Sequence, residues 1–408
     1  MKAMWAGYAK MVITPPMGVE LCGYGYYLQR RATGVLDDLH VRCTALRTRT
    51  EKCLLLSADL IGLSESIAWQ IRSAICERFG YGQSDILLVS THTHTGPATN
   101  HLEGCGVEDP AYEATLPELF VKAAERAIQD EKCVTELLLT DEAIDPIGFN
   151  RTQRAGPCDD HVRGALIRRG ANRPVALVSY GCHPVTLGRV SRISADYPGA
   201  VCKCFDERGM CAIFLNGLCG DIDPVSNLIA WGSGTKETLW EYAERIIDGF
   251  NKGLVSQQEI KLGTERFETA IPLEPIDEVQ VHKIAAAGTQ RQVAAAWEKK
   301  MQKCPPVDVE EPICVQTMRL NSLLFCAIPY EGYTTIGDIV RKALPDYNVA
   351  VLGCSDGVKG YLPTRDEWAK GSYAALDAAL LYMRAPIRTG AAEMLGEEIG
   401  ERLRRTLR

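Results

Sequence analysis

Two continuously apolar, strand-length segments flank an amphipathic helix near the start of the chain, and this pattern restricts the fold more than any other. The segments are 52–59 (KCLLLSAD) and 85–94 (DILLVSTHTH), and residues 65–80 between them place Ile71 and Ile75 on one helical face. Together they form a strand–helix–strand unit. Because a strand that is apolar at every position is buried on both faces, we predict an α/β fold of mixed, largely parallel sheets covered by helices.

Polar side chains follow these apolar runs, and the pattern recurs further along the chain. Asp59, His92 and His94 follow the first two runs. Later in the chain, PVALVSYGCHP leads to His183 and CAIFLNGLCGDIDP leads to Asp221 and Asp223. LLFCAIPYE then leads to Glu331, and NVAVLGCSDGVKGYLPT leads to Tyr361. Ligands of α/β proteins bind beyond the carboxyl ends of the strands. We therefore predict a functional site, built around a metal, at these ends.

Composition excludes several classes of protein. The 408 residues carry a formal charge of −7 with acidic and basic residues interspersed, so we expect no nucleic-acid partner. No apolar run reaches the ~20 residues of a membrane span, so we expect no transmembrane segment. The N-terminus lacks the apolar core of a secretory signal, which predicts a cytoplasmic protein, and the 16 scattered cysteines then indicate reduced, mostly buried thiols.

The domain organisation is predicted to be simple. No repeat, low-complexity tract or linker divides the sequence, so we expect one domain over residues 1–408. Residues 275–304 (PIDEVQVHKIAAAGTQRQVAAAWEKKMQKC) have the pattern of a long amphipathic helix, which we interpret as a possible insertion packed on the outside.

Two histidines separated by one residue indicate a metal site. Residues i and i+2 of an extended segment point to the same side, so His92 and His94 can present two nitrogens to one point. A hydrolytic zinc needs about three protein ligands plus an open position, and His183 and Glu331 are candidates for the others. The alternative is a pair of solvated loop histidines, with His183 and Glu331 as structural residues. His101 is a weaker competitor, and His282 lies on the predicted outer helix.

These residues lie within a series of motifs that carries a family resemblance. THTHTGP, FNRT, GCHPVTLG, ISADYPGA, NGLCGDIDP, PYEGY and GYLPT follow one another along nearly the whole chain. This succession resembles the N-terminal catalytic domain of the neutral/alkaline non-lysosomal ceramidases, and THTHTGP is its most specific part. The resemblance implies a zinc amidase. This chain differs in having Tyr197-Pro198-Gly199 where the family usually has Asn-Lys-Gly, and we expect no C-terminal immunoglobulin-like domain.

The resemblance also implies roles for individual residues. It makes His92, His94 and His183 zinc ligands, with Glu331 and Tyr361 completing the metal environment. It further implies that Arg151 contacts the substrate and that Ser194 stands where the family has a serine assigned to the reaction.

The residue types allow hydrolysis of an amide by a metal-activated water. Tyr361 and Arg151 are candidates to stabilise the developing oxyanion, and Asp196 is a candidate proton carrier. Alternatively Asp196 caps the helix that follows it, and Asp221 either orients ligands or belongs to a glycine-rich turn.

Three functions are compatible with these residues. The first is hydrolysis of a small-molecule N-acyl substrate. The second is a metallo-esterase or deacetylase reaction at the same site, and the third is a metal- or ligand-binding protein without turnover. Because the chain offers no basic amphipathic segment rich in Trp or Phe for membrane docking, we expect a soluble substrate rather than ceramide.

Overall fold

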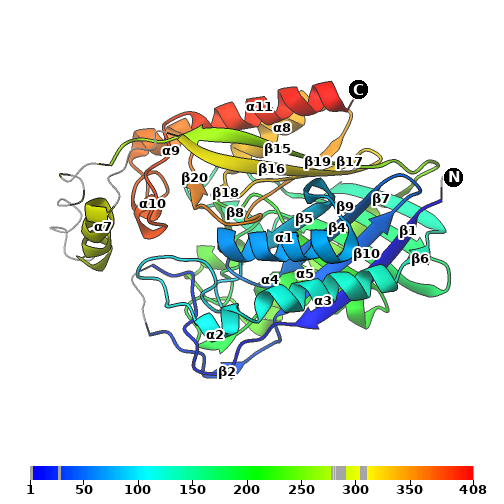
Figure 1. The fold of residues 1–408 in the computed structure, drawn as a ribbon, viewed down its shortest axis with the longest axis horizontal. Coiled ribbons are helices and arrows are strands. Elements are labelled where there is room, and N and C mark those ends of the chain that lie inside the picture. Colours follow the sequence, from blue (N-terminus) through cyan, green and yellow to red (C-terminus); the bar gives the residue numbers. More distant parts are fainter. Residues whose placement is uncertain are drawn as a thin grey trace.

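The protein is described by a computed structural model that covers residues 3–25, 29–276, 279, 281, 291–303 and 310–407. Three main sheets, each with helices on its outer face, pack against one another (Figure 1). The first has the strand order β5 (Ile86–Ser90), β4 (Lys52–Ala58), β3 (His40–Arg47), β1 (Trp5–Val12) and β6 (Lys132–Cys133).

The other two main sheets follow later in the chain. The second has the order β12 (Cys211–Asn216), β10 (Asn172–Tyr180), β9 (His161–Arg169), β7 (Glu136–Ala143) and β14 (Val255–Ser256). The third has the order β15 (Leu262–Pro272), β16 (Glu310–Leu320), β17 (Leu323–Ala327) and β19 (Asn348–Leu352). Three short pairs complete the strands: β2 (Gly34–Val35) with β11 (Arg192–Ile193), β8 (Gly148–Asn150) with β13 (Ile222–Pro224), and β18 (Glu331–Gly332) with β20 (Tyr361–Leu362).

A pair of helices covers the outer face of each main sheet. The pairs are α1 (Glu65–Phe79) with α3 (Leu116–Gln129) on the first sheet, α4 (Asp196–Glu207) with α5 (Lys236–Lys252) on the second, and α8 (Thr334–Ala343) with α11 (Ala391–Thr406) on the third. The shorter helices are α2 (Pro110–Glu113), α7 (Arg291–Lys303), α9 (Arg365–Lys370), α10 (Asp377–Leu381) and the 3₁₀ turns at 83–85 and 225–228.

The inner faces of all three sheets meet in one central core. On β4, Leu55 enters this core while Leu54 packs under α1 and α3. On β17, Phe325 enters it while Leu324 packs under α8 and α11. Alternate residues of a strand point to opposite faces, so a strand buried on both faces needs apolar residues at every position. This confirms the predicted helix-covered α/β arrangement.

The expectation of largely parallel sheets is wrong. Most pairings between the described strands are antiparallel, as in β3–β4, β9–β10 and β16–β17. These neighbours are joined by tight turns, such as the one where Thr48 donates its N–H to Glu51 O. A continuous apolar run reports burial on both faces, but strand direction depends on the connection between strands.

Each main sheet nevertheless contains one parallel pair, and each pair is a strand–helix–strand unit. The three units are β4–α1–β5, β10–α4–β12 and β17–α8–β19. Their carboxyl ends lie together: Ser90 donates its N–H to Cys354 O, and Gly353 donates to Asn216 O. The predicted convergence of strand ends is therefore present, but it joins one edge from each of three sheets.

Part of the expected outer helix at 275–304 lies outside the described residues, including His282. Within the described part, α7 covers Arg291–Lys303 and packs beside α10 (Figure 1). The Trp297 indole of α7 donates a hydrogen bond to Leu380 O. Across the described chain, no helix combines the length and apolar character needed to span a bilayer. The described cysteines are free thiols, and most are buried.

Candidate metal centre

Three buried imidazoles converge at the carboxyl ends of the parallel pairs. His92 and His94 follow β5, and His183 follows β10. One nitrogen of each ring can be chosen so that all three lie within 4.8 Å of one another. The ring centroids are 4.8 Å apart for His92 and His94, and 5.1 Å and 5.4 Å from these two rings to His183. The two histidines of THTHTGP therefore face one point together with His183.

The backbone that brings His92 and His94 together is not an extended strand. Strand β5 ends at Ser90, and His92 has a φ of 69°, in the left-handed region. The left-handed conformation of a non-glycine residue costs about 1–3 kcal/mol of strain, and it persists only where surrounding contacts hold it. Here its N–H donates to Leu60 O over 2.9 Å. The predicted convergence is present, but a strained turn produces it rather than the alternation of side chains along a strand.

Backbone carbonyl groups orient two of the imidazoles. His92 Nδ1 lies 2.6 Å from Ile61 O, and His183 Nδ1 bonds to Cys219 O. With Nδ1 engaged as a donor, Nε2 of each ring faces the Glu331 carboxylate, to which it donates when protonated and beside which it can bind a metal ion when neutral. This is the arrangement by which proteins commonly orient metal-binding histidines.

His94 has no hydrogen-bond partner for either ring nitrogen among the described residues, although the ring is buried. Burial and the neighbouring His92 and His183 rings lower its pKa well below the usual value, so the imidazole is neutral. Gly23, with a φ of 113°, lies so close that a Cβ there would be 2.5 Å from His94 Nδ1. A buried neutral nitrogen without a partner is a potential metal ligand.

Glu331 supplies a carboxylate to the same point. Its Oε2 lies 3.1 Å from His92 Nε2 and 3.0 Å from His183 Nε2, while its Oε1 accepts a 2.6 Å bond from the Tyr382 hydroxyl. Burial alone would raise the pKa of Glu331, but His92 and His183 hold it well below its usual value, so the group is ionised.

Tyr382 was not singled out from the sequence. It lies just beyond α10 in ALLYMR, a segment without a distinctive motif. Only the packing of α10 brings it to Glu331.

Tyr361 and Arg151 lie beside the histidines. The Tyr361 hydroxyl is 3.4 Å from His183 Nε2 and accepts a 2.9 Å bond from Arg151 Nη2. Arg151 also donates to Gly220 O over 2.8 Å and to Asp223 over 3.2 Å. Burial raises the pKa of Tyr361 well above its usual value, so the phenol stays protonated. The structure thus brings both residues to the point where the imidazoles meet.

Asp221 bonds to residues that lie next to Arg151 in the chain and at the start of α8. Its carboxylate accepts bonds from Asn150 Nδ2 over 3.0 Å and from the N–H and hydroxyl of Thr334 over 2.9 and 3.0 Å. Its carbonyl accepts the Arg151 N–H over 2.8 Å. These bonds attach the carboxylate to Asn150 and to the first residue of α8, while the contact with Arg151 is made between backbone atoms.

Ser194 and Asp196 lie on the other side of the His94 loop. The Ser194 carbonyl accepts 2.8 Å bonds from the hydroxyls of Thr93 and Thr95, which flank His94. Its own hydroxyl donates to Asp37 over 2.6 Å and accepts the Asp196 N–H over 3.0 Å. These contacts join Ser194 to the loop rather than to an imidazole nitrogen.

The Asp196 carboxylate is engaged with backbone N–H groups. It accepts a 2.8 Å bond from Tyr197 in the first turn of α4 and a 3.3 Å bond from Leu187. Burial raises the pKa of Asp196 to about 6, while hydrogen bonds from Thr186, Tyr197 and Leu187 act in the opposite direction. The contact with Tyr197 agrees with the capping alternative, although α4 begins at Asp196 itself.

Two further histidines lie apart from this group. His101 is exposed and contacts Glu108 over 2.9 Å, and His161 contacts Asp141 over 2.6 Å. Ordinary acid partners satisfy both rings, so neither is needed to explain the convergence of the other three.

An apolar surface lies beside His94. The Tyr24 ring is 5.2 Å from the His94 ring and 5.1 Å from the Trp231 ring. Trp231 is 49% exposed and Ile229, two residues earlier, is 87% exposed. No motif in the sequence identified Trp231 as lying near His94, because it follows Asp223 in an irregular segment.

The side chains form a group that could hold a metal ion, and we compare it with zinc. Zinc binds imidazole nitrogen at about 2.0–2.1 Å and carboxylate oxygen at about 2.0–2.2 Å, so neighbouring tetrahedral ligands lie about 3.3 Å apart. The distances of 3.1 and 3.0 Å from Glu331 Oε2 to the two Nε2 atoms agree with this separation. Both ring nitrogens of His94 and the Nε2 of His92 form no hydrogen bond to a described group. Their lack of a partner is consistent with binding of the same ion.

Comparison with known proteins supports the fold. No family model matches the sequence, and no curated protein matches it in sequence. Among solved structures, the neutral ceramidase from Pseudomonas aeruginosa superimposes with a TM-score of 0.77 at 16% identity, covering 100% of this chain and 75% of that one. A ceramidase complexed with C2 gives a TM-score of 0.76 at 15% identity over 100% and 76%. The resemblance predicted from the motifs is confirmed as a similarity of fold.

The three-histidine centre predicts metal binding that depends on each ring. We expect about one zinc per chain. We also expect His92→Ala and His183→Ala each to weaken zinc binding by more than about 100-fold, because loss of only a residue that hydrogen-bonds to a metal ligand already costs about 10–100-fold in affinity. Elemental analysis and competition with a chelator measure this. His161→Ala, which removes an imidazole outside the group, serves as the control and should retain zinc. Full occupancy in folded His92→Ala protein would contradict the assignment.

The raised pKa of Asp196 predicts a pH-dependent cost of folding. The carboxyl group of an unfolded Asp has a pKa near 3.9, so the native state binds the Asp196 proton more tightly than the unfolded state does. Protonation of Asp196 therefore stabilises the native state fully below about pH 4, and this stabilisation is lost as the pH rises through about 6. The difference corresponds to about 3 kcal/mol. Relative to wild type, Asp196→Asn should therefore gain up to about 3 kcal/mol of unfolding free energy between pH 4 and pH 7.

Urea unfolding at several pH values, with a chelator present so that zinc release adds no pH dependence, measures this difference. The exposed Asp346→Asn is the matched control and should follow the wild-type profile. Parallel pH profiles for wild type and Asp196→Asn would show that Asp196 titrates as an ordinary carboxyl group.

Proposed function

We propose that the protein is a zinc-dependent hydrolase that cleaves a linear amide (N-acyl) bond. The observation that carries the proposal is the convergence of His92, His94, His183 and Glu331 on one buried point beside Arg151 and Tyr361. Each main sheet contributes to this point through the residues that follow its parallel pair. We therefore also propose that the three layers act as one catalytic domain.

The groups around this point suit hydrolysis at a carbonyl. Zinc, when bound, lowers the pKa of water and polarises a carbonyl oxygen. The protonated Tyr361 phenol and the Arg151 guanidinium lie side by side, and both can donate to an oxygen on which negative charge develops. Gly220 O and Asp223 hold the guanidinium in place, so little reorganisation is needed during the reaction.

Ser194 and Asp196 fit a positioning role in this proposal. Ser194 holds Thr93 and Thr95 on either side of His94, and Asp196 bonds to the Ser194 hydroxyl through its N–H. The contact with the loop is made by the Ser194 backbone carbonyl, so the Ser194 hydroxyl acts on the His94 loop indirectly, through its bonds to Asp37 and to the Asp196 N–H. A direct proton transfer from Asp196 has less support, because its oxygens accept backbone N–H groups.

The fold similarity to ceramidase structures supports amide cleavage over the ester and deacetylase alternatives. A binding protein without turnover is less well supported. It would need the metal ligands, but it would not need Arg151 and Tyr361 paired beside them.

We propose that the substrate is a short, water-soluble N-acyl compound. The exposed Trp231 beside Tyr24 offers an apolar surface to its acyl part, and the exposed Ile229 precedes it by two residues. This surface is a short segment rather than a basic amphipathic helix of the kind that docks on membranes.

Removal of the two donors should lower turnover more than binding. Loss of one oxyanion donor costs about 10²–10³ in kcat, so we expect Tyr361→Phe and Arg151→Lys each to lower kcat on an N-acyl substrate by about that factor. Zinc content should be measured in parallel, because Tyr361 lies near the metal ligands. Tyr347→Phe, which removes a hydroxyl bonded to Leu407 O, is the control. If both variants stay within about twofold of wild-type kcat, the proposed role of this pair is incorrect.

Substrate preference tests the soluble N-acyl proposal. We expect chelator-sensitive hydrolysis of short N-acyl amides, with a higher kcat/KM than for long-chain ceramide or for matched esters. Ceramide should be assayed in detergent micelles as well as in buffer, so that poor delivery is not mistaken for poor chemistry. A preference of about tenfold or more for micellar ceramide, equivalent to ~1.4 kcal/mol, would contradict the proposal. Preference for esters would favour the alternative reaction.

A further inference from the structure

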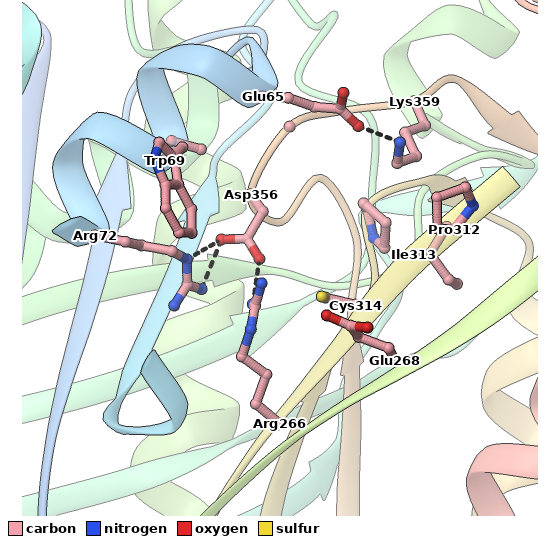
Figure 2. Close-up of a pocket in the computed structure, with 13 residues that line it drawn as sticks. Glu65, Trp69, Arg72, Arg266, Glu268, Pro312, Ile313, Cys314, Asp356 and Lys359 are labelled. Carbon is pink, nitrogen blue, oxygen red and sulfur yellow. Dashed lines mark hydrogen bonds and ion pairs between the residues drawn. The ribbon is translucent and has the colours of Figure 1, made fainter. Parts of the chain in front are cut away.

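A separate pocket of about 330 Å³ opens between helix α1 and the strands β15 and β16 (Figure 2). Trp69 from α1, Arg266 and Glu268 from β15, Ile313 from β16 and Asp356 from the segment after β19 are among the residues that line it. None of the proposed zinc ligands lines this pocket. It is therefore a different site from the metal centre.

Two segments of the chain lead from this pocket to the candidate metal centre. The segment after β19 carries Asp356 and Lys359 into the pocket and continues to Tyr361. The segment before α1 supplies Ile61 O to His92 and leads to Glu65 in the pocket.

Two arginines of the pocket already share one carboxylate. Arg72 Nε and Arg266 Nη1 lie 2.6 Å and 3.0 Å from the oxygens of Asp356, as Figure 2 shows. Arg72 is almost fully buried and also donates to Gln83 O over 3.0 Å. Asp356 has a φ of 48°, so these bonds also hold a strained backbone position. The two guanidinium groups are thus committed to the structure of the loop.

The remaining cation of the pocket is paired as well. Lys359 Nζ bonds to Glu65 and lies 3.4 Å from Glu311, and its side chain is only 9% exposed. The ammonium group and the two guanidinium groups of the pocket therefore each have a carboxylate partner.

Glu268 has no such partner. Its side chain lines the pocket from β15, and no lysine or arginine within the described residues lies within ion-pair distance of its carboxylate. Arg266, two residues earlier on the same strand, is bound to Asp356 instead. Among the charged groups that line the pocket, Glu268 is thus the one without an ion-pair partner in the described part of the chain, and it is negative.

An indole and apolar side chains form the rest of the surface. Trp69 is 61% exposed at the rim, opposite the strand that carries Glu268. Pro312, Ile313 and Pro329 line the pocket between the charged groups. The face of an indole ring attracts organic cations, and quaternary ammonium groups are recognised in this way. The volume has room for roughly ten non-hydrogen atoms at ~30 Å³ each.

We propose that this pocket binds a small organic cation with a compact apolar body, such as an alkylated ammonium ion. Glu268 neutralises the charge, and the Trp69 ring and the two prolines contact the alkyl groups. The proposal does not depend on the reaction proposed for the metal centre, because it rests on residues that take no part in that site.

Choline is a suitable probe, and 3,3-dimethylbutan-1-ol, its uncharged isostere, is the matched ligand control. Titration of the zinc-loaded protein by calorimetry or ligand-observed NMR should give one saturable choline site per chain. Glu268→Gln and Trp69→Leu should each weaken choline binding about two- to fivefold, and the double variant roughly tenfold. Glu310→Gln, on the neighbouring strand outside the pocket, should bind choline as the wild type does.

Several results would overturn the proposal. They are the absence of saturable choline binding, equal affinity for the uncharged isostere, and unchanged affinity in Glu268→Gln. Binding of acetate in place of choline would show that the paired arginines, rather than Glu268, select the ligand. Because Trp69 and Glu268 are exposed, their variants should fold normally, and a thermal melt checks this.

Discussion

The hydrogen bonds that join the carboxyl ends of three parallel strand pairs hold the rest of the structure in place. Asn216 is fully buried at the end of β12. Its side-chain Nδ2 donates to Thr91 O over 3.0 Å, and its backbone carbonyl accepts the Gly353 N–H over 3.2 Å. Ser90 at the end of β5 donates to Cys354 O over 3.0 Å. Buried backbone groups must be paired, so these three ends cannot move independently. Side chains that leave them are consequently held at one point.

The cost of gathering these side chains is substantial and local. Three imidazoles and a carboxylate are withdrawn from water, and His92 occupies a left-handed backbone conformation. Carbonyl groups of Ile61 and Cys219 satisfy one nitrogen of two rings, but His94 has no such partner among the described residues. Strain and unpaired buried nitrogen atoms concentrated in one place are typical of sites retained for chemistry rather than stability.

The segment after β19 connects two parts of the molecule with different chemistry. At one end Tyr361 faces the imidazoles, and at the other Asp356 is held between two arginines in a separate pocket. Left-handed conformations at Cys354 and Asp356 show that neighbouring contacts, rather than local preference, determine the path of this segment. One segment therefore supplies side chains both to the ion pairs of the pocket and to the candidate metal centre.

Much of this arrangement can be read from the sequence, because its signals are local. Apolar residues at every position of 52–58 indicate a strand buried on both faces, and polar residues at the ends of such strands indicate where a site lies. The sequence could not determine that most strands are antiparallel, since burial does not report direction. Nor could it show that Tyr382 reaches Glu331, that His92 is strained, or that Glu268 and Trp69 line one pocket. These depend on contacts between residues far apart in the chain, which only the packing of the three layers brings together.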